Sequence, residues 1–199
     1  MNTKKLALTI VFAALTVALN PAISRIGIPA PYAPYLIYGL WEIPIVAAFL
    51  LIGSRSAIAI SLLNALVLFA FYPGFLPAGP FYNLVAIMSM LSGVYLANKF
   101  FTRNPASESR NVLMITIATA LGITFRVIIM TIVNFVTLQQ PYPFGLTLGQ
   151  IATIATLPLT ALFNGTVVLY TVPIAYLVTR TIQRNIHLNI DQKTDTKFS

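Results

Sequence analysis

The stretch Val112–Leu138, VLMITIATALGITFRVIIMTIVNFVTL, decides the fold class, because Arg126 is its only charged residue. A helix needs roughly 20 predominantly apolar residues to cross the hydrocarbon core of a bilayer. The stretch is long enough, and it lacks the alternation of polar and apolar residues that marks the strands of an outer-membrane barrel. It therefore predicts a membrane-spanning helix that carries a cation near its middle.

Five other apolar blocks repeat this pattern. The chain is 58% hydrophobic and 8% charged, whereas soluble domains carry about 25% charged residues. The sequence therefore predicts an all-α integral membrane protein, a bundle of six transmembrane helices. The predicted spans are Leu6–Ile23, Leu36–Ile52, Ser56–Tyr72, Phe81–Phe100, Val112–Leu138 and Ile151–Ile182.

We expect a single transmembrane domain over residues 1–182 and a polar cytoplasmic tail over residues 183–199. The first apolar block follows a basic start, as in a signal peptide, but no A-x-A cleavage site follows it. We interpret it as a retained helix. Pro158 and Pro173 predict a kink in the last span, and Pro44 could break the second, because proline removes a helix hydrogen bond.

The basic residues predict the orientation, because cytoplasmic loops are enriched in lysine and arginine. With the N-terminus inside, ten of the twelve fall on the cytoplasmic side, and only Arg25 lies outside while Arg126 lies within a span. Both termini are therefore expected in the cytoplasm, in a multi-pass protein of the plasma membrane. The ten are Lys4, Lys5, Arg55, Lys99, Arg103, Arg110, Arg180, Arg184, Lys193 and Lys197.

Several kinds of chemistry are disfavoured by composition. The chain has no cysteine, and its one histidine, His187, lies in the polar tail, so a zinc or haem site is not expected. We find no carboxylate pair or Ser-His arrangement and do not expect an enzyme. No GxxxxGK[ST] loop is present for binding ATP. The chain is expected to be a binder, a passive conduit, or a subunit energised by a partner.

Acidic residues are few: Glu42, Glu108, Asp191 and Asp195. None is expected at the middle of the membrane, because Glu42 is predicted near the outer end of its span, so a proton relay is not expected. Arg126 is consequently predicted to have no acidic partner. It would bond to backbone carbonyls or to an anionic ligand group, or it would extend towards the cytoplasm.

Small residues recur at every fourth position of the first span, at Ala14, Ala18 and Ala22. Such a stripe allows two helices to approach closely, either within the bundle or with a partner protein. The three outward loops, residues 28–42, 72–83 and 139–150, are rich in proline, glycine and aromatic residues and nearly uncharged. They suit either a pocket for a flat, neutral ligand or an interfacial aromatic belt.

Asparagines punctuate the spans, and an amide in hydrocarbon must find a partner. Most of them are expected to join helices. Asn134 and Asn164 lie in the outer halves of the last two spans, where they could converge beneath the aromatic loops. The predicted substrate-binding residues are Tyr35, Tyr38 and Trp41 for stacking and Asn83, Arg126, Asn134 and Asn164 for polar contacts.

Four stretches resemble a known family. The first helix, Lys5-LALTIVFAALTVAL, and the segment Tyr38-GLWEIPIVAAFLLIGSRSAIAISLLNAL resemble the first three helices of S components, the substrate-binding subunits of energy-coupling factor (ECF) vitamin transporters. The stretches Val127-IIMTIVNFV and Leu157-PLTALFNGTVV resemble the fifth and sixth helices of the riboflavin-type members.

The resemblance implies a vitamin importer without a cofactor of its own. The vitamin would be bound as the transported substrate, and ATP would be used only by partner subunits. The partners implied are a transmembrane coupling subunit, which would meet Ala14 and Ala18, and two cytoplasmic ATPases. Asn134 and Asn164 match asparagines that contact riboflavin, the favoured vitamin. Val167 replaces the lysine of that pattern, so a vitamin with an anionic group, bound by Arg126, is the alternative, and a self-sufficient facilitator or channel is another.

Overall fold

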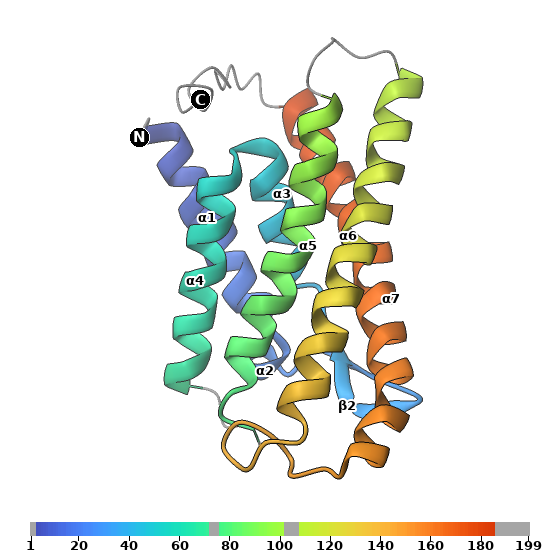
Figure 1. Ribbon diagram of the computed structural model, residues 1–199. Coiled ribbons are helices and arrows are strands. Elements are labelled where there is room, and N and C mark those ends of the chain that lie inside the picture. Colours follow the sequence, from blue (N-terminus) through green and yellow to red (C-terminus); the bar gives the residue numbers. More distant parts are fainter. Residues whose placement is uncertain (1–2, 72–75, 102–107, 186–199) are drawn as a thin grey trace, which may run out of the picture.

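The computed structural model describes residues 3–71, 76–101 and 108–185. Within these residues, five helices run along the long axis of the molecule (Figure 1). They are α1 (Thr3–Leu19), α4 (Ser54–Phe71), α5 (Gly79–Phe101), α6 (Glu108–Thr137) and α7 (Gln150–Asn185). The shorter elements are α2 (Pro21–Ser24), β1 (Ile28–Ala30), β2 (Ala33–Tyr38) and α3 (Glu42–Leu51).

Four of the six predicted spans are confirmed as helices of membrane length. Within the described residues α4, α5, α6 and α7 are long and apolar enough to cross a bilayer. The first span is helical but shorter than predicted, because α1 ends at Leu19 and Pro21 begins the separate turn α2. The side chain of Asn20 caps that turn by accepting a hydrogen bond from the backbone N–H of Ala22. Helix α7 continues through both Pro158 and Pro173.

The prediction of a second full-length span over residues 36–52 is wrong. Its beginning is strand β2, which pairs antiparallel with β1, and its helix α3 has only 10 residues. Proline explains the difference. Pro29, Pro31 and Pro34 each have a fixed φ, and each restricts the residue before it to extended conformations, which disfavours a helix. Pro44 does not break α3, because it lies in the first turn of the helix. The backbone N–H groups of that turn have no partner within the helix, so a proline there costs no hydrogen bond.

Helix α3 is the centre of the bundle. It contacts α1, α4, α5 and α7, and its residues from Glu42 to Phe49 are all buried. A helix that is apolar all round lies either in a protein core or against lipid. Helix α3, which departs from this pattern only at Glu42, is enclosed by the other helices. Gly53, with φ of 129°, ends the helix and reverses the chain into α4. A residue with a side chain would be strained there.

Helices α5 and α6 approach closely at Gly93, where an added methyl group would overlap the backbone carbonyl of Leu121. We expect Gly93→Ala to lower the free energy of unfolding by about 1–3 kcal/mol, because the overlap forces the helices apart. Gly165→Ala on α7 is the matched control, since its methyl would lie 3.7 Å from Val127. That change should be neutral or stabilising by up to about 1 kcal/mol through helix propensity. Denaturation in mixed micelles measures both, and equal stabilities would contradict the close approach.

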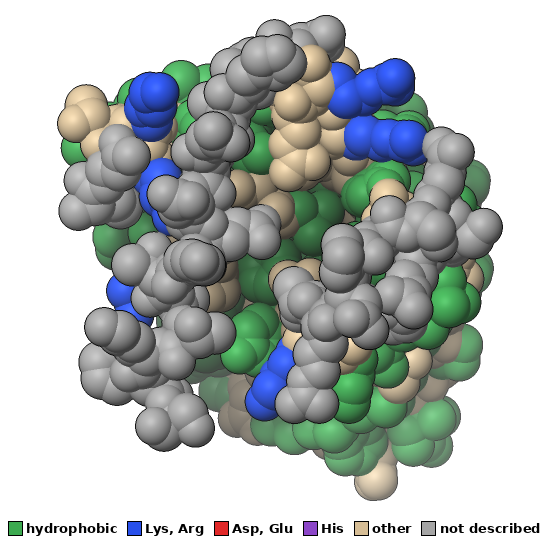
Figure 2. All heavy atoms as spheres, turned by 90° about the horizontal axis from the view of Figure 1, so that it is seen from above, with side chains coloured by type: hydrophobic (Ala, Val, Ile, Leu, Met, Phe, Trp, Pro, Cys, Tyr) green, Lys and Arg blue, Asp and Glu red, His purple; other side chains and the backbone are tan. Residues whose placement is uncertain are grey.

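The two ends of the bundle differ in charge. The N-terminus of α1, the start of α4 and the ends of α5 and α7 lie together at the top of Figure 1. Figure 2 shows lysine and arginine side chains around the rim of this end. We call it the basic end, and we call the opposite end, which holds β1 and β2, the hairpin end. Of the predicted cytoplasmic cations, Arg103, Lys193 and Lys197 lie outside the described residues, as does most of the predicted tail.

Candidate functional site

A buried network of charged and polar side chains joins α3, α6 and α7. Arg126 donates hydrogen bonds to both carboxylate oxygens of Glu42, through Nη1 to Oε2 and through Nη2 to Oε1 at 2.9 Å. Its Nε donates to the amide oxygen of Asn164 at 2.9 Å. The amide nitrogen of Asn164 in turn donates to the Thr160 carbonyl at 2.8 Å. Glu42, Arg126 and Asn164 are only 3%, 3% and 5% exposed.

The expectation that Arg126 lacks an acidic partner is wrong. Because the chain before α3 forms a hairpin and not a helix, α3 begins inside the bundle, and Glu42 is its first residue. Its carboxylate therefore meets the guanidinium of Arg126 in the interior. A buried charge is tolerated when it is paired and hydrogen-bonded, and each of the three guanidinium nitrogens of Arg126 donates a hydrogen bond here. The charge that could have attracted an anionic ligand is thus balanced within the protein.

An aromatic cluster connects the hairpin to α7. The ring of Tyr38 on β2 packs against Phe163, with centroids 4.8 Å apart, and meets the edge of Tyr170 at 6.4 Å. The hydroxyl of Tyr170 donates to the carbonyl of Gly39 at 2.7 Å. Because Phe163 precedes Asn164, this cluster lies directly beside the buried network. The structure therefore joins three predicted site residues, Tyr38, Arg126 and Asn164, in one region.

A hydrogen bond between two tyrosine hydroxyls joins the turn of the hairpin to the end of β2. The hydroxyl oxygens of Tyr32 and Tyr38 lie 2.5 Å apart. Desolvation, and secondly the hydrogen bond and charge interaction with Tyr38, raise the pKa of Tyr32 to about 12. The Tyr32 hydroxyl is therefore neutral at physiological pH.

The other predicted residues lie elsewhere. Tyr35 is 62% exposed on the outer face of β2, and Trp41 belongs to the hydrophobic core. Asn83 is exposed on α5. Asn134 is partly buried on α6, and its amide nitrogen donates to the Met130 carbonyl at 2.7 Å. Whether any of these residues contacts a ligand stays a prediction.

A cavity of about 650 Å³ lies at the hairpin end between α4, α5, α6 and the loop that follows α6. Most of its lining is aromatic or proline, and all of it except Phe69 and Thr137 belongs to the second and third outward loops singled out from composition. The hydroxyl of Tyr82 donates to the Phe144 carbonyl across it. Residues 72–75 of the second outward loop lie outside the described residues. The lining residues are Phe69, Pro77, Ala78, Phe81, Tyr82, Thr137, Gln140, Pro143 and Phe144.

Sequence reasoning missed Glu42, Phe163 and Tyr170 as members of the site. A usable signal existed for Glu42, because it is the one acidic residue inside the predicted spans, and Arg126 is the cation nearest the middle of a span. In a low-dielectric interior, two opposite charges are far less costly when paired. No comparable signal marked Phe163 and Tyr170, which are two aromatic residues among many. The described residues contain no group of three metal-ligating acids, histidines or cysteines.

The small stripe of α1 faces outward. Ala14 and Ala18 are exposed, as are the neighbouring Val11 and Leu15, while Phe12 is buried on the opposite side. The helix thus packs into the bundle through Phe12, Ala13 and Thr16, and it presents Ala14 and Ala18 to the surroundings among larger apolar residues. Packing within the bundle, one of the two explanations for the stripe, does not account for this face.

No protein-family model matches the sequence, and no curated protein matches it. The structure is similar to a solved structure described as "Structure and mechanism of the S component of a bacterial ECF transporter". The TM-score is 0.68, the sequence identity is 24%, and the match covers 92% of this chain and 98% of the other. At this identity the similarity shows a shared fold.

Proposed function

We propose that this chain is the substrate-binding membrane subunit, or S component, of an ECF-type importer that takes up a vitamin. The observation that carries the proposal is the shared fold with a bacterial S component over nearly the whole of both chains. The resemblance of four sequence stretches to the same family supports the proposal independently.

The proposal includes partners that supply energy. The sequence has no P-loop for ATP, and the acid within the described helical core, Glu42, is paired with Arg126 and is not poised to relay protons. A transmembrane coupling subunit and two cytoplasmic ATPases would drive transport. We place the protein in the plasma membrane with the basic end in the cytoplasm, in accordance with the positive-inside rule.

The vitamin is proposed to bind at the hairpin end, and riboflavin is the favoured candidate. The cavity there has a volume of about 650 Å³, within the range of roughly 300–1,000 Å³ typical of small-molecule sites. Its aromatic lining suits a flat ring system. The pairing of Arg126 with Glu42 favours a neutral ligand over one with a carboxylate or phosphate.

Asn134 and Asn164 are tested by flavin binding. The purified protein is expected to bind riboflavin and quench its fluorescence. Neither asparagine lines the cavity, and their role in binding rests on the family resemblance. Asn134→Ala and Asn164→Ala should each weaken binding by about 1–3 kcal/mol if the amide is buried against the ligand. Asn111→Ala is the control, since Asn111 lies on the same helix as Asn134, about 34 Å towards the basic end. Unchanged affinity in both variants would remove these asparagines from the site.

The energy source is tested with vesicles that contain this chain alone. Binding without sustained uphill accumulation is expected when proton or sodium gradients are imposed, because the driving force belongs to other subunits. Sustained accumulation would contradict the proposal. Downhill flux that saturates at equilibrium would instead support the facilitator alternative.

A further inference from the structure

The hairpin-end cavity is bordered by phenylalanine rings from three separate elements. Phe69 lies on α4, Phe81 on α5, and Phe144 in the loop after α6, which runs across the hairpin end of the bundle (Figure 1). More than half of the surface of each of these residues is exposed. Aromatic side chains offer a large contact area to a flat partner, so this border favours a planar ligand.

The polar side chains of the described lining are already engaged within the protein. The hydroxyl of Tyr82 donates to the Phe144 carbonyl and also interacts with the side chain of Thr137. The amide nitrogen of Gln140 donates to the Val136 carbonyl at 3.3 Å. No described lining residue is charged. A hydrogen-bonding group of a ligand would therefore lose water on entering this cavity and would find few partners there.

The cavity consequently favours the part of a ligand that carries no hydrogen-bonding groups. Burial without a partner is costly for a donor or an acceptor, whereas burial of an apolar group is favourable. A flavin ring has two unlike edges. Its benzenoid edge carries two methyl groups, and its pyrimidine edge carries two carbonyls and an N–H. The benzenoid edge is the one that matches this lining.

We infer that the hairpin-end cavity takes the apolar, benzenoid edge of the flavin ring and leaves the pyrimidine edge and the ribityl chain outside its lining. The inference rests on the proposed function, from which the flavin is taken. It agrees with the positions of Asn134 and Asn164, neither of which lines the cavity. The hydrogen-bonding groups of the ligand that stay outside the lining remain available to such amides.

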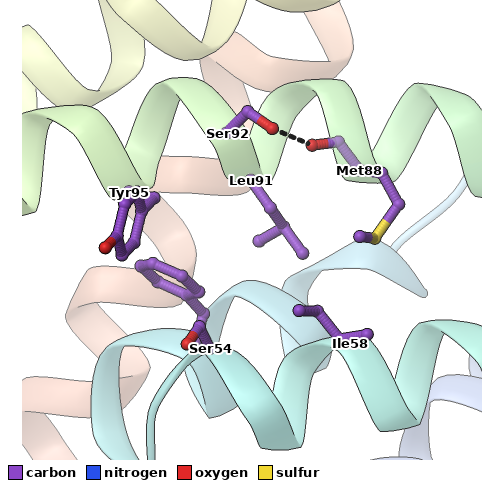
Figure 3. A pocket seen from close by; sticks show the side chains of 7 residues that line it. Ser54, Ile58, Met88, Leu91, Ser92 and Tyr95 are labelled. Atoms are coloured by element: carbon purple, nitrogen blue, oxygen red, sulfur yellow. Dashed lines mark hydrogen bonds between the residues drawn. The ribbon is translucent and has the colours of Figure 1, made fainter. Parts of the chain in front are cut away.

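A second cavity, of about 330 Å³, lies between α4 and α5 in the half of the bundle nearer the basic end. Figure 3 shows Ile58, Leu91 and Tyr95 pointing into it. The ring of Tyr95 packs edge-on against Phe49, with centroids 6.5 Å apart, so these two aromatic residues are engaged with each other. Ser92 is an exposed residue of its lining. This smaller cavity provides a control site within the same chain.

Fluorescence titration of the purified full chain with riboflavin and 7,8-didemethylriboflavin tests the inference. The analogue differs from riboflavin only in that hydrogen replaces both methyl groups of the benzenoid edge. We expect it to bind about tenfold more weakly, because the burial of two methyl groups is lost. Phe144→Ala and Phe81→Ala should each reduce this difference to about threefold, because each removes part of the apolar border that the methyl groups contact.

Two control variants separate this cavity from other surfaces. Phe100→Ala is an equal truncation of an exposed phenylalanine at the other end of α5, and Ser92→Trp fills the second cavity. Both should retain the full difference between the two flavins. Equal affinities in the unaltered protein, or the same difference in every variant, would overturn the inference and leave the proposed function standing. A protein that binds neither flavin would overturn both the inference and the choice of riboflavin.

Discussion

Replacing Arg126 with methionine is expected to lower the free energy of unfolding by about 3–5 kcal/mol, the cost of leaving one member of a buried ion pair without its partner. Glu42 would remain 3% exposed with no cation beside it. Asn164 would also lose the donor to its amide oxygen. SDS-induced unfolding in mixed micelles measures the loss, and Arg184→Met, an exposed change on α7, should alter stability by less than about 0.5 kcal/mol.

The double variant Glu42→Met/Arg126→Met shows whether the loss arises from the orphaned charge. Apolar replacement of a whole buried ion pair is often neutral or stabilising, so the double variant should regain most of the stability. The recovery should fall short by about 1–3 kcal/mol, because the amide oxygen of Asn164 remains buried without its donor. A double variant no more stable than Arg126→Met would contradict a direct pairing of Glu42 with Arg126.

Placing phenylalanine at both Ala14 and Ala18 is expected to reduce vitamin uptake by cells to background. Bulky side chains would hold a partner helix away from the exposed small face of α1, and close approach is the main source of helix association in lipid. Riboflavin affinity of the purified variant should stay within about twofold, since α1 does not line the hairpin-end cavity. Uptake of labelled vitamin and fluorescence titration provide the two measurements.

The matched control for this prediction lies on α6. Ala120 and Thr124 are both exposed and have the same four-residue spacing, so Ala120→Phe with Thr124→Phe adds equal bulk to another outer face. Uptake should then be retained. Normal uptake in the α1 variant at an unchanged protein level would remove the docking role, whereas loss in both variants would indicate a general effect of bulk.

The sequence predicted the elements that lipid itself imposes. An apolar block long enough to span a bilayer must satisfy its backbone hydrogen bonds internally, so it must be helical wherever it packs. Helices α4 to α7 follow from that requirement with boundaries within a few residues. The same reasoning failed for residues 36–41, because tyrosine, leucine and isoleucine are apolar in a strand as well as in a helix. The three upstream prolines carried the contrary signal.

The candidate site was predictable in part. Tyr38, Arg126 and Asn164 were selected as polar or aromatic residues in apolar surroundings, and the structure brings them together. Trp41 and Asn83 satisfied the same criterion, yet one is buried in the core and the other exposed on α5. A single sequence gives the residue type and an approximate depth, but it does not give the rotation of each helix about its axis.

By itself, then, the amino-acid sequence determined the helical class, four membrane-length helices and the concentration of cations at one end, because these depend on local hydropathy and charge. Only the tertiary structure decided that Glu42 meets Arg126 across 84 residues, that α3 lies enclosed at the centre, and that an aromatic-lined cavity opens at the hairpin end. These features depend on where the chain turns and how the helices are rotated. Both are set by packing among distant segments, which no local pattern encodes.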